Sequence, residues 1–259
     1  MELGLKGRRA LVTGGSKGLG RAIALELARE GAAVAICSRN RAECDAVVAE
    51  LRALGTTGWA YEADVTVGSD VDRLVEEAAS ELGGLDILVN NAGGARPGTF
   101  ETLTDEDWQI DFDTKVGSII RVCRAALPHL RASSAARIVN IGAVQGKAPD
   151  PTFCSTSALR AAGNNLTKVL AQQYGPEGIL VNAVNIGLVT TPQWANIRQR
   201  KAPHLTADEF AATLTADVPL GRFGRDDEVS GVVTFLASDR ASYVTGVLID
   251  VAGGMGRYA

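Results

Sequence analysis

Residues 13–20 form a glycine-rich segment, TGGSKGLG, whose backbone could bind the phosphates of a dinucleotide. Glycine allows a tight turn and a close approach of the backbone to a pyrophosphate. A helical pattern follows directly, and the N-terminus of a helix offers unpaired N–H groups and a partial positive charge to an anion. Because the segment lies between a first strand and a first helix, it favours a dinucleotide site over a plain tight turn. The glycine spacing is GxxxGxG, not GxGxxG.

The elements that must position this turn are visible as short β-branched runs that alternate with longer segments of helical periodicity. Such alternation is typical of repeated βαβ units, which build a parallel sheet covered by helices on both faces. We therefore predict an α/β fold: a single Rossmann-like, doubly wound domain over residues 1–259 with about seven parallel strands. The predicted strands include residues 10–13, 33–37, 60–65, 87–90, 138–141, 180–184 and 247–251, and the predicted helices include residues 19–30, 70–82, 108–130 and 164–174.

The alternation stops between Thr190 and Gly224, where the chain has polar helical patterns but no strand. Insertions of this length are usually lids or binding loops. We expect residues of about 190–224 to form a substrate loop. Its apolar residues Trp194, Ile197 and Phe210 suggest a small-molecule substrate that is partly apolar.

Composition excludes several other classes of protein. The chain carries 26 Lys and Arg against 30 Asp and Glu, a net charge of −4, and no basic stripe, so we expect no nucleic-acid partner. The four cysteines are scattered and only two histidines are present, which argues against a disulfide framework or a metal site. The N-terminal apolar run is too short for a signal segment or a membrane span. We expect a cytoplasmic protein with no membrane partner.

Several motifs in the chain resemble those of the short-chain dehydrogenase/reductase family. Besides the glycine turn, Asp64-Val65 is similar to the family's adenine-contacting pair, and residues 90–93 match its NNAG motif. Residues 219–224 (PLGRFG) and 243–246 (YVTG) are similar to its closing segments. The resemblance covers nearly the whole chain. It implies a Rossmann-like sheet, a nicotinamide cofactor and assembly as a homodimer or homotetramer.

The charge after the second predicted strand indicates which nicotinamide cofactor binds. A site for NAD(H) usually carries an acid there, whereas the 2′-phosphate of NADP(H) needs cations. This chain has Ser38-Arg39-Asn40, and Lys17 adds a second positive charge, so we predict NADP(H) over NAD(H). The alternative is that Arg39 is only a solvated loop residue. The predicted cofactor-binding residues are Gly14, Ser16, Lys17, Gly18, Leu19, Gly20, Ser38, Arg39, Asn40, Asp64, Val65, Asn91, Ala92, Gly93, Ile141, Gly187, Val189 and Thr191.

The family's catalytic group is an Asn-Ser-Tyr-Lys set, and the resemblance places other residues at all four positions. Lys115 falls at the Asn position, Ala143 at the Ser position, Thr156 at the Tyr position and Arg160 at the Lys position. No tyrosine in the chain has a lysine four residues later. A threonine hydroxyl is too weakly acidic to donate a proton alone near neutral pH, and loss of a general acid typically lowers the rate by about 10²–10⁴.

The replacements suggest a catalytic set of their own. If the family geometry holds, Lys115 and Arg160 both approach the nicotinamide, and the nearby guanidinium would lower the pKa of the lysine. Lys115 could then donate a proton to a carbonyl. The alternative is that Lys115 only pairs with Asp111 or Asp113, while Arg160 replaces the lysine that holds the cofactor ribose.

Two functional interpretations, and a weaker third, follow from these patterns. The first is an NADP(H)-dependent oxidoreductase that acts on a carbonyl or alcohol with an unusual proton donor. The second is a catalytically inactive NADP(H)-binding protein, such as a sensor or a silent subunit. The third is non-redox chemistry on the same fold. We favour the oxidoreductase because the cofactor motifs are retained and the replacing side chains are cationic.

Overall fold

The computed structural model describes residues 2–256, apart from the side chains of residues 192, 193, 196 and 201. Within it, seven parallel strands form one sheet in the order β3-β2-β1-β4-β5-β6-β7. The order reverses between β1 and β4, and ligands of such sheets bind at the carboxyl ends of the strands near this reversal. The predicted doubly wound sheet is therefore confirmed. The strands are β1 (Arg9–Thr13), β2 (Ala33–Ser38), β3 (Gly58–Glu62), β4 (Ile87–Asn90), β5 (Arg137–Ala143), β6 (Leu180–Ile186) and β7 (Leu248–Val251).

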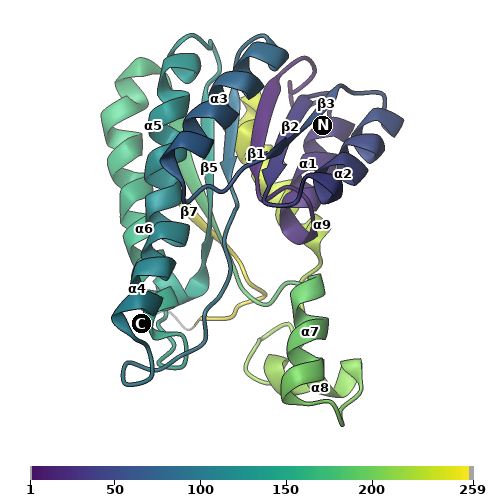
Figure 1. The fold of residues 1–259 in the computed structure, drawn as a ribbon, viewed down its shortest axis with the longest axis vertical. Coiled ribbons are helices and arrows are strands. Elements are labelled where there is room, and N and C mark those ends of the chain that lie inside the picture. The colour runs from purple at the N-terminus through teal and green to yellow at the C-terminus, as the bar shows by residue number, and fades with distance from the viewer. Residues whose placement is uncertain (1, 257–259) are drawn as a thin grey trace.

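Helices cover both faces of the sheet (Figure 1). One layer holds α1 (Gly18–Arg29), α2 (Arg41–Ala53) and α9 (Asp226–Ala237), and the other holds α3 (Gly68–Leu82), α5 (Ser118–Arg131) and α6 (Cys154–Tyr174). The helix α4 (Asp105–Phe112) leads into α5 through a π-helical turn, η1 (Asp113–Gly117). The described residues also form three short 3₁₀ turns: η2 (Val144–Gly146), η3 (Gly175–Glu177) and η4 (Asp239–Ala241).

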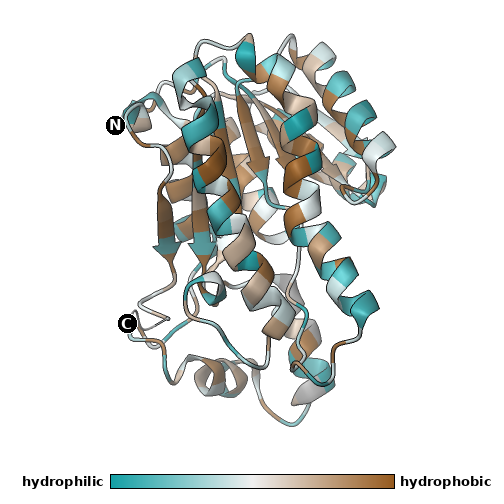
Figure 2. Ribbon diagram, turned by 90° about the vertical axis from the view of Figure 1, so that its left-hand side faces the viewer, coloured by the Kyte–Doolittle hydropathy of each residue, from teal (hydrophilic) through white to brown (hydrophobic). Residues whose placement is uncertain are grey.

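The two helical layers explain why the strands read as continuous apolar runs. Neighbouring side chains of a strand point to opposite faces. Thus Val12 packs in the core beneath α1, α2 and α9, while the adjacent Leu11 packs in the core beneath α3 and α5. Both side chains are fully buried. Figure 2 shows the apolar strands enclosed by helices that are apolar on one face and polar on the other.

Some element boundaries differ from the predicted ones. Strand β3 ends at Glu62, before the predicted limit of residue 65, because the carboxylate of Asp64 closes a turn with the backbone N–H and hydroxyl of Thr66. Helix α6 begins at Cys154, ten residues before the predicted start at residue 164, in a Ser/Thr-containing segment without a clear apolar period. Helices α2 and α9 are not among the helices named in the prediction.

The insertion between β6 and α9 forms two helices, α7 (Pro192–Lys201) and α8 (Ala207–Thr215). They extend beyond the carboxyl edge of the sheet, at the bottom of Figure 1. Backbone hydrogen bonds join the two ends of the insertion: the N–H of Thr190 donates to Gly224 O (2.8 Å) and the N–H of Gly224 donates to Leu188 O (2.8 Å). Trp194 fastens α7 to this base through its indole N–H to Val189 O (2.9 Å) and edge-to-face contact with Phe223.

Among the described residues, no helix has the length and apolar character needed to cross a bilayer.

Candidate functional site

The glycine turn after β1 has a conformation that only glycine adopts easily. Gly14 and Gly18 have φ angles of +65° and +53°, in the left-handed region that side chains disfavour. A Cβ at Gly20 would lie 2.2 Å from the carbonyl oxygen of Gly14. The turn therefore needs glycine at all three positions, either for its backbone angles or for its close packing.

Side chains from β1 and from the segment after β4 hold this turn in place. The Asn91 amide donates to the carbonyl oxygens of Thr13 (3.0 Å) and Gly14 (3.1 Å). In return, the hydroxyl oxygen of Thr13 accepts hydrogen bonds from the backbone N–H groups of Asn91 (3.0 Å) and Ala92 (3.1 Å). Four hydrogen bonds thus fix the backbone at the point where the strand order reverses. They account for Thr13 in the glycine turn and for Asn91, the second asparagine of the NNAG motif.

The start of α1 suits a pyrophosphate. The helix begins at Gly18, no side chain caps its N-terminus, and its first turn contains no acidic residue. Its first N–H groups therefore remain available to an anion. The glycines keep the turn tight against Asn91 and Ala92, directly before this uncapped helix start, so the residues present fit a dinucleotide.

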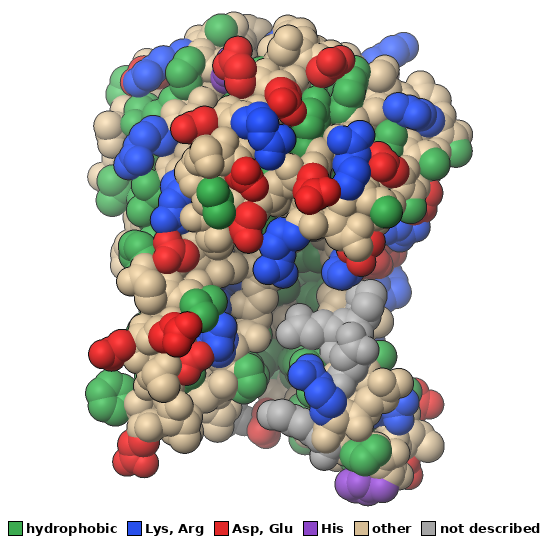
Figure 3. Space-filling model, viewed as in Figure 1, with side chains coloured by type: hydrophobic (Ala, Val, Ile, Leu, Met, Phe, Trp, Pro, Cys, Tyr) green, Lys and Arg blue, Asp and Glu red, His purple; other side chains and the backbone are tan. Residues whose placement is uncertain are grey.

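The other predicted cofactor residues lie at the same edge of the sheet. Asp64 and Val65 follow β3, Ala92 and Gly93 follow β4, Ile141 lies near the end of β5, and Gly187, Val189 and Thr191 follow β6. Because all strands are parallel, their carboxyl ends meet at this edge. Figure 3 shows the surface hollowed between the part carrying α4 and the part carrying α7 and α8.

Of the three predicted cofactor-binding residues at the end of β2 and just after it, two make local hydrogen bonds. Ser38 accepts a hydrogen bond from the backbone N–H of Asn40 (3.1 Å), and the Asn40 side chain caps α2 by accepting from the N–H of Glu43. Arg39 is exposed. The Glu43 carboxylate accepts hydrogen bonds from Ser16 Oγ (3.1 Å) and Lys17 Nζ (3.3 Å). The predicted cation Lys17 therefore has a partner that the sequence pattern did not indicate.

Lys115 lies in the π-helical turn η1 at the centre of the long helical segment α4-η1-α5. Such turns are rare and are frequently found at functional sites. The side chain of Lys115 is only 1% exposed, and its Nζ lies 2.6 Å from Asp111 Oδ1. The lysine thus pairs with Asp111, as the alternative interpretation expects.

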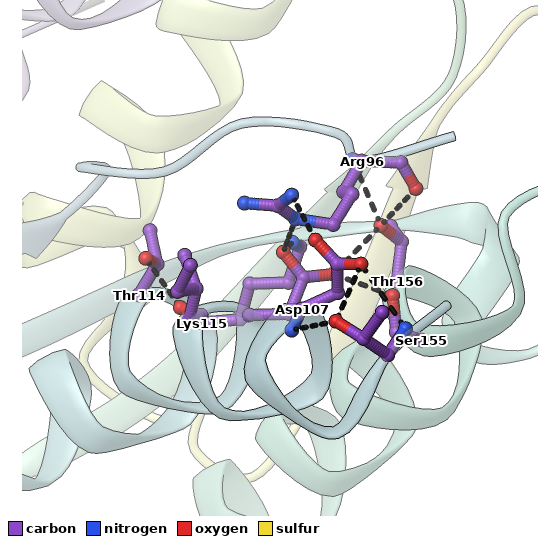
Figure 4. Close-up of polar contacts among 9 residues, drawn as sticks. Arg96, Asp107, Thr114, Lys115, Ser155 and Thr156 are labelled. Carbon is purple, nitrogen blue, oxygen red and sulfur yellow. Dashed lines mark hydrogen bonds and ion pairs between the residues drawn. The ribbon is translucent and has the colours of Figure 1, made fainter. Parts of the chain in front are cut away.

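Asp111 is the centre of a buried polar cluster (Figure 4). Besides Lys115, its carboxylate accepts from Ser155 Oγ (2.7 Å) and from Arg96 Nε (3.3 Å). Arg96 comes from the loop after β4 and also binds Asp107 (2.6 Å). Three separate segments of the chain therefore meet at one carboxylate.

Thr156 lies beside this cluster. Its hydroxyl accepts from the backbone N–H of Arg96 (3.2 Å) and lies 3.5 Å from Asp111 Oδ2. Because Thr156 binds both Arg96 and Asp111, it connects the loop after β4 to α6 and α4.

Arg160 lies one helical turn after Thr156 on α6 and is turned toward β5. Its Nη1 donates to the carbonyl oxygen of Ile141 (2.7 Å), and its Nε has no hydrogen-bond partner among the described residues. A Cβ at Gly93 would lie 3.2 Å from its Nη2. Burial lowers the pKa of Arg160 to about 10, which still leaves the guanidinium charged at neutral pH. The carbonyl of Ile141, one of the predicted cofactor-binding residues, is thus engaged by Arg160.

The pKa of Lys115 is lowered to about 8. Burial is the largest cause, and the charges of Arg160 and Arg96 lower the pKa further. The hydrogen bond and the charge of Asp111 act in the opposite direction. The predicted direction of the shift is therefore confirmed, but desolvation contributes more than the guanidinium on which the prediction rested.

The structure brings Lys115, Thr156 and Arg160 together and adds Arg96 and Ser155, which sequence reasoning did not identify as site residues. The i, i+4 spacing of Asp111 and Lys115 on a helix indicates their pairing. No sequence signal indicates Arg96 or Ser155. The contacts of Arg96 depend on the path of the loop after β4, and Ser155 lies at the start of α6, ahead of the predicted helix start at residue 164. Ala143 ends β5 at the position that the resemblance assigns to serine. Within residues 2–256, no group of three or more His, Cys, Asp or Glu residues could hold a metal ion.

The doubly wound sheet and the glycine turn define the class of Rossmann dinucleotide-binding proteins. A family model described as enoyl-(acyl carrier protein) reductase matches residues 14–256. The chain is 34% identical over 249 residues to 3-oxoacyl-(acyl-carrier-protein) reductase FabG of Staphylococcus aureus, covering 96% of this chain and 98% of the relative. The chain belongs to the short-chain dehydrogenase/reductase family.

Solved structures agree with this assignment. A short-chain oxidoreductase of Pseudomonas aeruginosa PAO1, described as containing an atypical catalytic center, has 38% identity and a TM-score of 0.93 in its apo form, covering 99% of this chain and 100% of that one. Its NADPH-bound form has 37% identity and a TM-score of 0.92, over 97% and 98% of the two chains. L-sorbose reductase of Gluconobacter frateurii, complexed with NADPH and L-sorbose, has 29% identity and a TM-score of 0.95, over 100% of each chain.

Replacement of Asp111 by asparagine should strongly destabilise the protein, because it leaves the Lys115 ammonium buried without its counter-charge. Breaking a buried ion pair typically costs about 3–5 kcal/mol. Asp113→Asn is the matched control, since Asp113 also pairs with an arginine but is partly exposed, and such pairs contribute about 1 kcal/mol or less. Urea unfolding monitored by circular dichroism measures both changes. Equal losses in the two variants would contradict the central role of Asp111.

Proposed function

We propose that this protein is an NADPH-dependent reductase of a carbonyl group in which Lys115 is the proton donor. The supporting observation is the buried Lys115 ammonium, held 2.6 Å from Asp111 and beside Thr156 and Arg160. Lys115, Thr156 and Arg160 stand where the family resemblance places catalytic residues. The chain's membership of an oxidoreductase family supports the same proposal.

The cofactor residues are those at the carboxyl edge of the sheet. The glycine turn and the N-terminus of α1 would hold the pyrophosphate, and Asp64 and Val65 would contact the adenine. Ser16, Lys17 and Arg39 would recognise a 2′-phosphate, because a phosphate requires cations and hydrogen-bond donors. When bound, the cofactor supplies the hydride. Two solved relatives, from Pseudomonas aeruginosa and Gluconobacter frateurii, hold NADPH.

Lys115 has the properties of a general acid. A pKa of about 8 keeps it mostly protonated at neutral pH while leaving the proton transferable, and a proton donor works best when its pKa is near the operating pH. Asp111 positions the ammonium. Arg160 places a second positive charge near Lys115, which would stabilise negative charge that develops on a carbonyl oxygen.

The substrate that we propose is a small, partly apolar carbonyl compound. The chain's relatives include a 3-oxoacyl-(acyl-carrier-protein) reductase and an L-sorbose reductase, both named for carbonyl substrates. The partly apolar character is inferred from the apolar residues of the α7-α8 insertion, of which Phe210 is buried and Trp194 packs against Phe223.

A second candidate function is a catalytically inactive NADP(H)-binding protein. The observation that favours it is that the Lys115 side chain is almost completely buried and is already bound to Asp111. A lysine held in this way could be structural only. Binding of NADPH without any carbonyl reduction would support this candidate.

The first test is a calorimetric titration of the protein with NADPH and with NADH. We expect a micromolar Kd for NADPH and weaker binding of NADH. Arg39→Gln should weaken NADPH binding by about tenfold to a hundredfold, since a hydrogen bond to a charged group contributes roughly 1.5–3 kcal/mol. It should leave NADH binding unchanged. Arg52→Gln, on the exposed surface of α2, is the control. Absence of binding to both cofactors would contradict both candidate functions.

Lys115→Met should lower kcat for carbonyl reduction by about 10²–10⁴ while NADPH still binds. In the wild type, reduction should fall as the pH rises through about 8, because Lys115 then loses the proton that it donates. NADPH consumption with acetoacetyl-CoA and with L-sorbose measures both effects. Lys168→Met, on the exposed face of α6, is the control. Unchanged turnover in Lys115→Met would eliminate the lysine as donor.

We also propose that the protein assembles as a homodimer or homotetramer. The apolar side chains of Ile110 and Phe112 at the end of α4 are 42% and 40% exposed, and Phe100 is 78% exposed. Exposed apolar side chains of this kind often mark a surface that another subunit covers. Light scattering at micromolar concentration should give two or four times the 27.0 kDa of one chain. A monomeric mass would refute the proposal.

A further inference from the structure

Glu43 places a negative charge on the groups that would recognise a 2′-phosphate. Its carboxylate Oε2 lies 3.1 Å from Ser16 Oγ and 3.2 Å from Lys17 Nζ. Ser16 and Lys17 belong to the glycine turn, whereas Glu43 belongs to the first turn of α2. The contact therefore connects two elements that are separated in the sequence by a whole helix and a strand.

The local structure keeps Glu43 in this place. Asn40 caps α2 by accepting from the N–H of Glu43 (3.3 Å), and Ser38 in turn binds the backbone of Asn40. Hydrogen bonds from Lys17 and Ser16 hold the pKa of Glu43 below its ordinary value. The side chain is therefore a carboxylate at neutral pH, with both of its oxygens directed at the glycine turn.

A 2′-phosphate needs the same two groups. Of the three residues that would recognise it, Ser16 and Lys17 are engaged by Glu43 and only Arg39 is not bound to this carboxylate. A phosphate that approaches Lys17 must displace the carboxylate or lie next to it. Like charges at such distances repel. NADH carries no 2′-phosphate and meets no such competition.

We propose that Glu43 occupies the 2′-phosphate subsite as an intramolecular ligand and so narrows the preference for NADPH over NADH. This inference rests on the proposed function. The opposite role is that Glu43 accepts a hydrogen bond from the ribose 2′-hydroxyl, as an acid after the second strand does in many NAD(H) sites. The two roles predict different effects on NADH binding when the charge is removed: no change if Glu43 competes with the phosphate, and weaker binding if it accepts from the ribose.

Glu43→Gln tests the inference, because it removes the charge and keeps the shape. The matched control is Glu50→Gln: Glu50 lies two turns further along α2 and pairs with Arg21 of α1 (2.9 Å) instead of with Ser16 or Lys17. The probes are adenosine 2′,5′-bisphosphate and 5′-AMP, together with NADPH and NADH, all titrated by calorimetry. A thermal melt of each variant shows that it is folded, and Glu43→Ala is a second variant without a side-chain amide.

We expect Glu43→Gln to lower the Kd for adenosine 2′,5′-bisphosphate and for NADPH by about threefold to tenfold. The Kd for 5′-AMP and for NADH should stay within about twofold of the wild-type value. The gain should shrink at high salt, since exposed charges are screened. Glu50→Gln should change the Kd of none of these four ligands.

Unchanged or weaker binding of NADPH to both Glu43 variants would overturn the proposal that Glu43 competes with the 2′-phosphate. Weaker binding of NADH to Glu43→Gln, with NADPH unchanged, would assign the carboxylate to the ribose hydroxyl instead. If the wild type binds NADPH and NADH but the variants do not differ from it, only this inference fails. If the wild type binds no cofactor and no probe, the proposed function fails and the inference fails with it.

Discussion

The buried pair of Asp111 and Lys115 is the constraint on which the rest of the candidate site depends. Removing two charges from water is costly, and the cost is offset only when the remaining hydrogen-bonding capacity is also satisfied. Asp111 meets this condition with donors from three segments, its own helix, α6 and the loop after β4. The positions of Ser155 and Arg96 therefore follow from the need to surround one carboxylate.

The arrangement of the sheet decides where this pair is placed. Parallel strands bring the glycine turn, the Asn91 loop and the end of β5 to one edge. Helix α6 packs against β5, so that Arg160 reaches the carbonyl of Ile141. The polar cluster and the dinucleotide turn are thus neighbours through topology alone. The π-helical turn at residues 113–117 lets one helical segment bury apolar residues such as Val122 against the sheet and still direct Lys115 toward α6.

Much of this could be predicted from the sequence, because the signals are local. A glycine turn between a strand and a helix, and β-branched runs at regular intervals, predict the sheet and its ligand edge. The closeness of Lys115, Thr156 and Arg160 followed from the family resemblance. The contacts of Arg96 could not be predicted, because they depend on the path of an irregular loop. The contact of Ser155 could not be predicted either, because it depends on how the start of α6 packs against α4. Glu43 was missed for a different reason: it follows the Ser38-Arg39-Asn40 segment by only three residues, but its direction depends on how Asn40 starts α2.

The backbone pairing of Val189 with Gly224 makes the α7-α8 insertion a loop whose ends are already joined. The entropy of closing a flexible loop grows only with the logarithm of its length, about 0.6 kcal/mol for each doubling. The interior of the insertion can therefore be shortened, lengthened or exchanged with little thermodynamic effect on the sheet. In evolutionary terms, this chain can acquire a new ligand preference by altering one segment, while the core continues to fold as before.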